Sequence, residues 1–186
     1  TTANNNTAVG YDALTANTTG FENNAFGYLA LDANTTGAYN VAVGSNALGS
    51  NTTASYNSAL GHYALGANTT GAYNTAMGWA ALDANTTASN NTAIGYNSLT
   101  ANTTGDKSTA VGSQALDANT TANRNVAIGY QSLTSNTTGA NNTACGTYSL
   151  LANSTGQDNA AFGDAALYNN TASYNTAVGR GAMSQN

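Results

Sequence analysis

The residue types that most often carry out chemistry are rare in this chain and widely separated. His62 is the only histidine and Cys145 the only cysteine, so one chain can build neither a His-based catalytic triad nor a two-histidine metal site. Asp32, Asp83 and Asp117 share one register of a repeating pattern, but the neighbouring repeats carry Gly or Thr there, which leaves no adjacent carboxylate pair in that register. We therefore expect no enzymatic activity, no cofactor and no metal site.

The motif with chemical meaning that does recur is the sequon Asn-x-Thr/Ser, the acceptor of N-linked glycans. A glycan at each repeat would form a row of sugars along one edge of the molecule and solubilise a surface that has few charges. The alternative is that Asn-Thr-Thr is only good turn chemistry in an Asn- and Thr-rich repeat. Further sequons occur at Asn5, Asn90 and Asn141. The candidate glycosylation sites of the repeating row are Asn17, Asn34, Asn51, Asn68, Asn85, Asn102, Asn119, Asn136, Asn153 and Asn169.

All of these residues belong to a repeat that fills the whole chain. The glycine of the N-T-A-V-G motif recurs with a spacing of 17 residues nine times and 16 residues once. A fixed period of this kind is typical of a solenoid, in which stacked neighbours bury the apolar face that no single repeat can bury alone. We predict an all-β fold, a parallel β-solenoid (β-roll) of eleven 17-residue coils, as a single domain over residues 1–186 and a segment of a longer fibre.

Three columns of the aligned repeats predict the core. The alanine column runs from Ala8 to Ala177 without exception, so its sites should have no room for a larger side chain. The leucine column runs from Leu14 to Leu167 and ends in Met183. The large apolar column, which we also expect to face the interior and in which the lone cysteine should act as a small hydrophobe, consists of Val9, Phe26, Val43, Leu60, Met77, Ile94, Val111, Ile128, Cys145, Phe162 and Val178.

The residue pattern within each repeat predicts two short strands joined by turns. Thr7–Val9 alternates in size and polarity before a glycine, and Ala13-Leu14 is expected to form the second strand. Asn17–Gly20 has turn chemistry. Stacked asparagines are expected to form amide ladders along the axis. One linker is a residue shorter than the others, and we expect the missing residue to be the alanine before Asn169.

The net charge and the exposed aromatic residues indicate which kinds of binding partner the chain could have. The chain has Asp+Glu 8 against Lys+Arg 3, a net charge of −5, which disfavours nucleic acid and anionic membranes. No apolar run is long enough to cross a bilayer. Tyr39, Tyr56 and Tyr73 share one register and suit either the stacking of sugar rings or simple stabilisation of the surface, and we favour the second.

The core motif resembles the head repeats of trimeric autotransporter adhesins and, equally, the repetitive shafts of phage tail fibres. The matching pieces are Asn6–Gly10, Asn91–Gly95, Asn125–Gly129 and Asn175–Gly179, and the resemblance covers the whole chain. It implies a left-handed, parallel β-roll wound as a homotrimer. The repeat here is longer than in the adhesin heads, so a single-chain solenoid and a laterally associated filament stay open.

We therefore expect a structural or adhesive extracellular fibre segment at a cell surface or on a virion. Its partners would be copies of itself and, at a surface, a carbohydrate or protein receptor. The alternatives are an N-glycosylated matrix filament, which would exceed the 18.6 kDa mass of the bare chain, and an ice-binding solenoid. For an ice-binding face, Thr18-Thr19 offers only one outward hydroxyl, because successive strand residues point to opposite sides.

Overall fold

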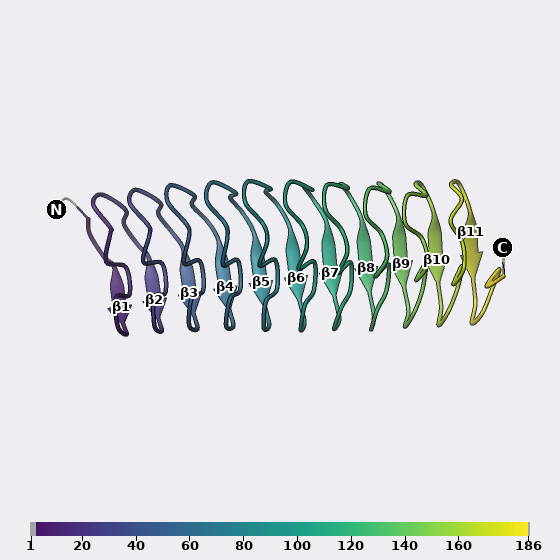
Figure 1. Cartoon of the computed structure of the whole chain (residues 1–186), viewed down its shortest axis with the longest axis horizontal. Coiled ribbons are helices and arrows are strands. Elements are labelled where there is room, and N and C mark those ends of the chain that lie inside the picture. Colours follow the sequence, from purple (N-terminus) through teal and green to yellow (C-terminus); the bar gives the residue numbers. More distant parts are fainter. Residues whose placement is uncertain (1–2, 186) are drawn as a thin grey trace.

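The computed structural model describes residues 3–185 as a rod of stacked coils, each contributing one short strand to a single parallel sheet. The strands follow one another along the sheet in chain order, with the two termini at opposite ends of the rod (Figure 1). This confirms the all-β, parallel solenoid. The eleven strands are β1 (Thr7–Val9), β2 (Asn24–Phe26), β3 (Val41–Val43), β4 (Ser58–Leu60), β5 (Thr75–Met77), β6 (Thr92–Ile94), β7 (Thr109–Val111), β8 (Val126–Ile128), β9 (Thr143–Cys145), β10 (Ala160–Phe162) and β11 (Thr176–Val178).

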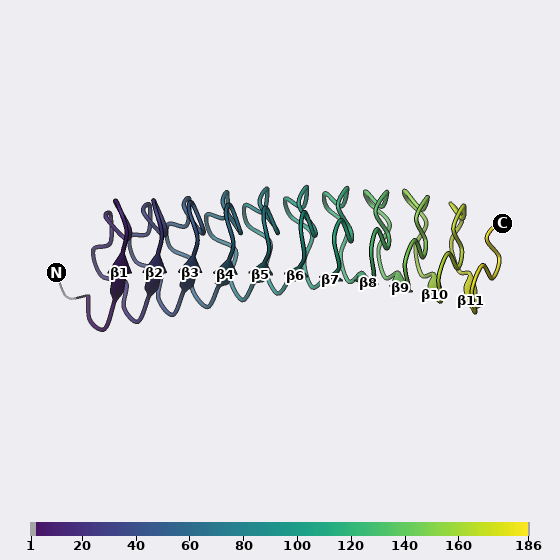
Figure 2. The same cartoon turned by 90° about the horizontal axis from the view of Figure 1, so that it is seen from below.

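Neighbouring strands pair in strict register, so identical repeat positions stack on one another. Ala93 of β6 lies beside Ala76 of β5 and Ala110 of β7. At about 4.8 Å per strand, the eleven coils make a rod roughly 50 Å long. The orientation of the coils changes gradually along the axis (Figure 2), as expected from the twist of β-sheets. Residues 3–185 include no helix that is long and apolar enough to span a membrane.

The predicted second strand is wrong, because the backbone at this position is left-handed. In one coil, Leu29 and Leu31 both have a φ of 53°, which lies outside the β region. The segment nevertheless hydrogen-bonds from coil to coil, with the Leu31 N–H donating to the Ala47 carbonyl at 3.1 Å. The backbone groups are therefore paired along the axis without forming a strand, and each coil needs only one.

The core is thinner than predicted and is made of small residues around the leucine column. The alanine column from Ala25 to Ala177 and a second column of alanine or serine from Ala30 to Ala166 are buried together with the leucines from Leu31 to Leu167. The alanine column is thus confirmed as a site without spare room. In the first coil, Ala8 is exposed. The large apolar column was wrongly assigned to the core, since Phe26, Leu60 and Met77 are 40%, 45% and 44% exposed. Successive strand residues point to opposite faces, so if the alanine points inward, the large residue after it points outward.

Two asparagine ladders hold the coils together, as predicted. Along the first, the Asn40 N–H donates to the Asn23 side-chain oxygen at 3.0 Å, and along the second, Asn34 Nδ2 donates to Asn17 Oδ1 at 3.0 Å. The ladders also meet within each coil, because Asn23 Nδ2 and Asn34 Nδ2 both donate to the Gly37 carbonyl, at 2.8 and 3.0 Å. Buried polar groups carry a large cost when unpaired, so these ladders fix the path of each coil at its corner.

The short linker differs from its expected position by one residue. Asn170, not Asn169, takes the ladder position, since its N–H donates to the Leu167 carbonyl at 3.1 Å, as the Asn153 N–H does to Leu150 at 3.2 Å. Asn170 Nδ2 then reaches the carbonyl of Ala172, only two residues on. The deletion therefore falls after the ladder asparagine, in the Thr-Thr part of the turn. The second ladder is interrupted there, because Asn153 Oδ1 is buried without a hydrogen-bond partner among the described residues.

Candidate functional site

The outer face of the sheet carries a continuous apolar stripe. Every coil places one member of the large apolar column there, exposed or half-buried, and Cys145 is a half-buried free thiol within it. The residue two positions earlier in each strand, most often threonine, shares this face. Between β3 and β5 the face is hollowed into a groove of about 230 Å³, lined by residues that include Val43, Leu60 and Met77. Apolar patches of this extent on a soluble surface are typical of interaction sites.

The predicted glycosylation row lies mostly inside the rod. Eight of its members, Asn34 to Asn153, are fully buried. A typical member, Asn85, uses its amide nitrogen to donate to Asn68 Oδ1 at 2.8 Å and to the Ala88 carbonyl at 3.1 Å. The folded rod therefore has no room for glycans at these eight positions. Asn17 is half-buried, whereas Asn169 and the separate sequons at Asn5, Asn90 and Asn141 are exposed.

The hydroxyl of the first threonine in these turns is also engaged within the rod. Thr35 Oγ1 donates to the Thr52 carbonyl at 3.0 Å, and Thr69 Oγ1 to the Thr86 carbonyl at 2.9 Å. The second threonine of each turn, as at Thr36 and Thr53, is exposed, so each coil presents one threonine hydroxyl at this surface, as expected from the sequence.

The exposed aromatic residues form stacks along the axis. Tyr56 stacks on Tyr39 and on Tyr73, with ring centroids 4.9 and 5.0 Å apart and the planes within 7° of parallel. Trp79 lies in the same way against Tyr96, with centroids 5.2 Å apart. The ring faces within each stack cover one another, so a sugar ring cannot stack on them, and this geometry favours the stabilising role.

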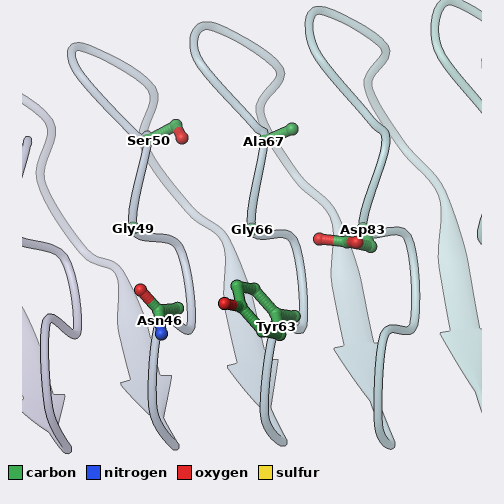
Figure 3. A pocket seen from close by; sticks show the side chains of 7 residues that line it. All are labelled: Asn46, Gly49, Ser50, Tyr63, Gly66, Ala67 and Asp83. Atoms are coloured by element: carbon green, nitrogen blue, oxygen red, sulfur yellow. The ribbon is translucent and has the colours of Figure 1, made fainter.

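A polar hollow of about 280 Å³ opens on the turn segments of three successive coils (Figure 3). Its floor is at Gly49 and Gly66, which occupy the register that holds Asp or Thr in most coils. Figure 3 shows the Asp83 side chain extending toward the coil of Gly66 and Tyr63 forming the wall below it. The remaining lining residues are Asn46, Ser50 and Ala67.

The surface of the hollow is rich in hydrogen-bond acceptors. A Cβ at Gly66 would lie 2.5 Å from Asp83 Oδ1 and 3.3 Å from the Tyr63 carbonyl oxygen. A Cβ at Gly49 would lie 3.4 Å from the Asn46 carbonyl oxygen and 3.5 Å from Asp32 Oδ1. The two missing side chains thus expose carbonyl and carboxylate oxygens from four adjacent coils.

Sequence reasoning missed this hollow, although it noted the acids. The signal was present as two consecutive glycines in the register of Asp32, Asp83 and Asp117. The same acids were predicted to have no carboxylate neighbour in that register, and the structure places glycines between Asp32 and Asp83. Among residues 3–185 no three His, Cys, Asp or Glu side chains gather as a metal-binding group.

Partial burial alters the acidity of these carboxyl groups. Desolvation raises the pKa of Asp83, and the nearby His62 charge partly offsets it. Desolvation also raises the pKa of Asp117, which lies in the same register between two threonine-bearing coils. Burial therefore makes the charged form of each carboxyl group less favourable than it is in water.

This burial predicts a pH-dependent effect of Asp117→Asn. The folded-state pKa lies above the ordinary 3.8, so the folded state binds more protons between the two values, and stability falls as the pH rises through that window. We expect Asp117→Asn to raise the thermal unfolding midpoint at neutral pH and to give no gain below pH 3.8. The exposed Asp158→Asn controls for the change in net charge. A gain that persists unchanged in acid would contradict a desolvation penalty.

Comparison of the chain with protein-family models, curated proteins and solved structures finds no significant match.

Proposed function

We propose that this chain is a structural segment of an extracellular fibre, at a cell surface or on a virion, that self-associates as a parallel homotrimer along the outer face of its sheet. The observation that carries the proposal is the exposed large apolar column. A column that stays large and apolar in eleven repeats while pointing outward is suited to a protein partner rather than to water.

The repeat geometry favours a second copy as that partner. The stripe extends along the whole sheet at one residue per strand, so its spacing matches that of an identical rod lying parallel to it. Closed symmetry is the usual way in which identical chains cover such a surface, and three stripes facing one axis would all be buried at once. The proposal includes no catalytic role for any residue.

The rod itself is suited to a mechanical role. Neighbouring coils are tied by strand pairing and by the asparagine ladders, the second of which is interrupted between Asn153 and Asn170, so stiffness arises from bonds that repeat along most of the rod. An adhesive role would add a receptor, either a carbohydrate or a protein, bound by exposed side chains.

The test is the solution mass of the chain and of a charged variant. We expect analytical ultracentrifugation at micromolar concentration to give three times 18.6 kDa for the wild type. The double substitution Met77→Glu and Ile94→Glu, on the outer face of β5 and β6, should give the monomer mass, because burying two unpaired carboxylates at an interface is costly.

A matched control places the same charges in the same two coils but on the turns. Thr87→Glu and Thr104→Glu are exposed and lie away from the strands, so this variant should stay trimeric. A monomeric wild type, or a trimer that both variants leave intact, would overturn the proposal.

A further inference from the structure

We propose that the hollow between Asn46 and Asp83 binds a primary ammonium group, presented by an amino sugar or by a lysine side chain. This inference is independent of the fibre proposal. The hollow is formed by the turn segments, whose alanines and leucines pack on the inner face of the sheet, whereas the apolar stripe is on the outer face. Monomer and trimer should therefore bind the ligand alike.

The first step concerns carbonyl oxygens that lack their usual donor. Where the register of Gly49 and Gly66 holds threonine, the hydroxyl donates to a carbonyl of the preceding coil. Thr100 Oγ1 donates to the Ala80 carbonyl at 2.6 Å. Thr134 Oγ1 donates likewise to the Gln114 carbonyl at 2.9 Å.

In the hollow this donor is missing from three coils in succession. Gly49 and Gly66 have no side chain that could donate to the equivalent carbonyls of Leu29 and Asn46. Asp83 stands opposite the third, that of Tyr63, and its carboxylate is itself an acceptor. The carbonyls of Asn46 and Tyr63 accept the backbone N–H groups of Gly49 and Gly66, at 3.2 and 3.1 Å, so each keeps one lone pair for a ligand. The space that threonine side chains fill in other coils is open here.

The second step concerns the carboxylate of Asp83. Its Oδ1 lies 2.5 Å from the position that a Cβ at Gly66 would take, and the carboxylate accepts no hydrogen bond from the described residues 3–185. It is half-buried beside the Tyr63 ring, whose Cδ1 lies 3.4 Å from the same Cβ position. A partly desolvated carboxylate that lacks a hydrogen-bond donor and lies next to an aromatic ring favours a cation over a neutral molecule.

The third step selects the kind of cation. A primary ammonium has three donors and no acceptor, which matches a carboxylate flanked by carbonyl oxygens. Divalent metal ions require several oxygen ligands in close contact, and Asp32 and Asp83 approach the hollow from its two ends, through Gly49 and Gly66 respectively. The hydroxyl of Ser50 and the amide of Asn46 lie at the rim, where they can bind hydroxyl groups of a sugar.

The experiment is an NMR titration of the full chain with glucosamine and, separately, with Nα-acetyl-lysine methylamide. We expect both to shift the backbone amide signals of Gly49 and Gly66, with dissociation constants on the order of millimolar. Glucose, which lacks the ammonium, should cause no shift. Binding of only one amine identifies the source of the ammonium and supports the site.

Two variants test the residues that carry the inference. Asp83→Asn removes the charge, and Gly49→Thr fills the floor with the side chain found in other coils. Each should weaken binding at least about tenfold, since a charge-assisted hydrogen bond or the space itself is lost. Asp117→Asn is the matched control, because it removes a similar carboxylate in a coil whose neighbours carry threonine, and it should leave binding unchanged.

Three results would overturn the proposal. These are equal shifts with glucose and glucosamine, shifts of the same amides by calcium chloride alone, and the absence of any shift with both amines. Unchanged amide spectra outside the hollow would show that each variant is folded.

Discussion

Gly95→Ala should be among the most damaging single-methyl changes in the rod, with an expected loss of roughly 3 kcal/mol or more in the free energy of unfolding. Gly95 has a φ of +135°, which residues with a Cβ rarely adopt, and the added carbon would lie 2.5 Å from the Gly112 carbonyl oxygen. The obstacle is the backbone of the next coil, which cannot rotate away. The measurement is chemical denaturation of the full chain.

Gly49→Ala provides the matched control for that change. Gly49 has no positive φ, and the nearest atom to its missing Cβ is 3.4 Å away. The same substitution here should stabilise the rod by about 0.4–1 kcal/mol, since alanine restricts the unfolded chain more than glycine does. Equal losses in the two variants would show that the stacked glycines are not closely packed.

Asn85→Leu should have the second largest effect, also about 3 kcal/mol or more. The substitution removes the bond to Asn68 Oδ1 and the bond accepted from Asn102 Nδ2, at 2.8 and 3.1 Å. Both partners are fully buried, so neither can turn to water. Leucine is apolar and similar in size, which makes lost hydrogen bonding the main cause of the change.

The control for the ladder is Thr87→Ala, an exposed position in the same turn, whose effect should be within about 0.5 kcal/mol of zero. Thermal unfolding of both variants, followed by circular dichroism, gives the comparison. If Asn85→Leu were as stable as the wild type, the asparagines would be turn formers only and the ladder would add nothing measurable.

The repeat period alone was enough to predict the architecture. A 17-residue spacing with an invariant alanine and an almost invariant leucine defines a coil, its stacking and two of its buried columns. Identical positions in a solenoid share one environment, so the eleven repeats act as eleven observations of each site. The amide ladders followed from the same logic, because stacked asparagines come within hydrogen-bonding distance.

The direction of each column was decided only by the tertiary structure. Val9 and its equivalents are as apolar as the leucine column, so residue type alone does not distinguish a column that faces the core from one on the outer face. The backbone decides, since β2 buries Ala25 in the core and leaves its neighbours Asn24 and Phe26 on the other face. The backbone at Leu29 and Leu31 is left-handed, a conformation that leucine does not favour, so the sequence predicted a strand at Leu31 where the structure has none.

The burial of the sequons and the existence of the hollow also required the fold. The Asn-Thr-Thr sequence is identical whether the asparagine lies in an exposed turn or in a buried ladder. Only the path of the chain places Asn85 in the interior. The residue type of Gly49 and Gly66 does not by itself indicate a hollow. The hollow arises because stacking places the two glycines next to each other, between Asp32 and Asp83. Such properties depend on which residues of different coils become neighbours, and that is determined by the stacking of coils rather than by the composition of any one repeat.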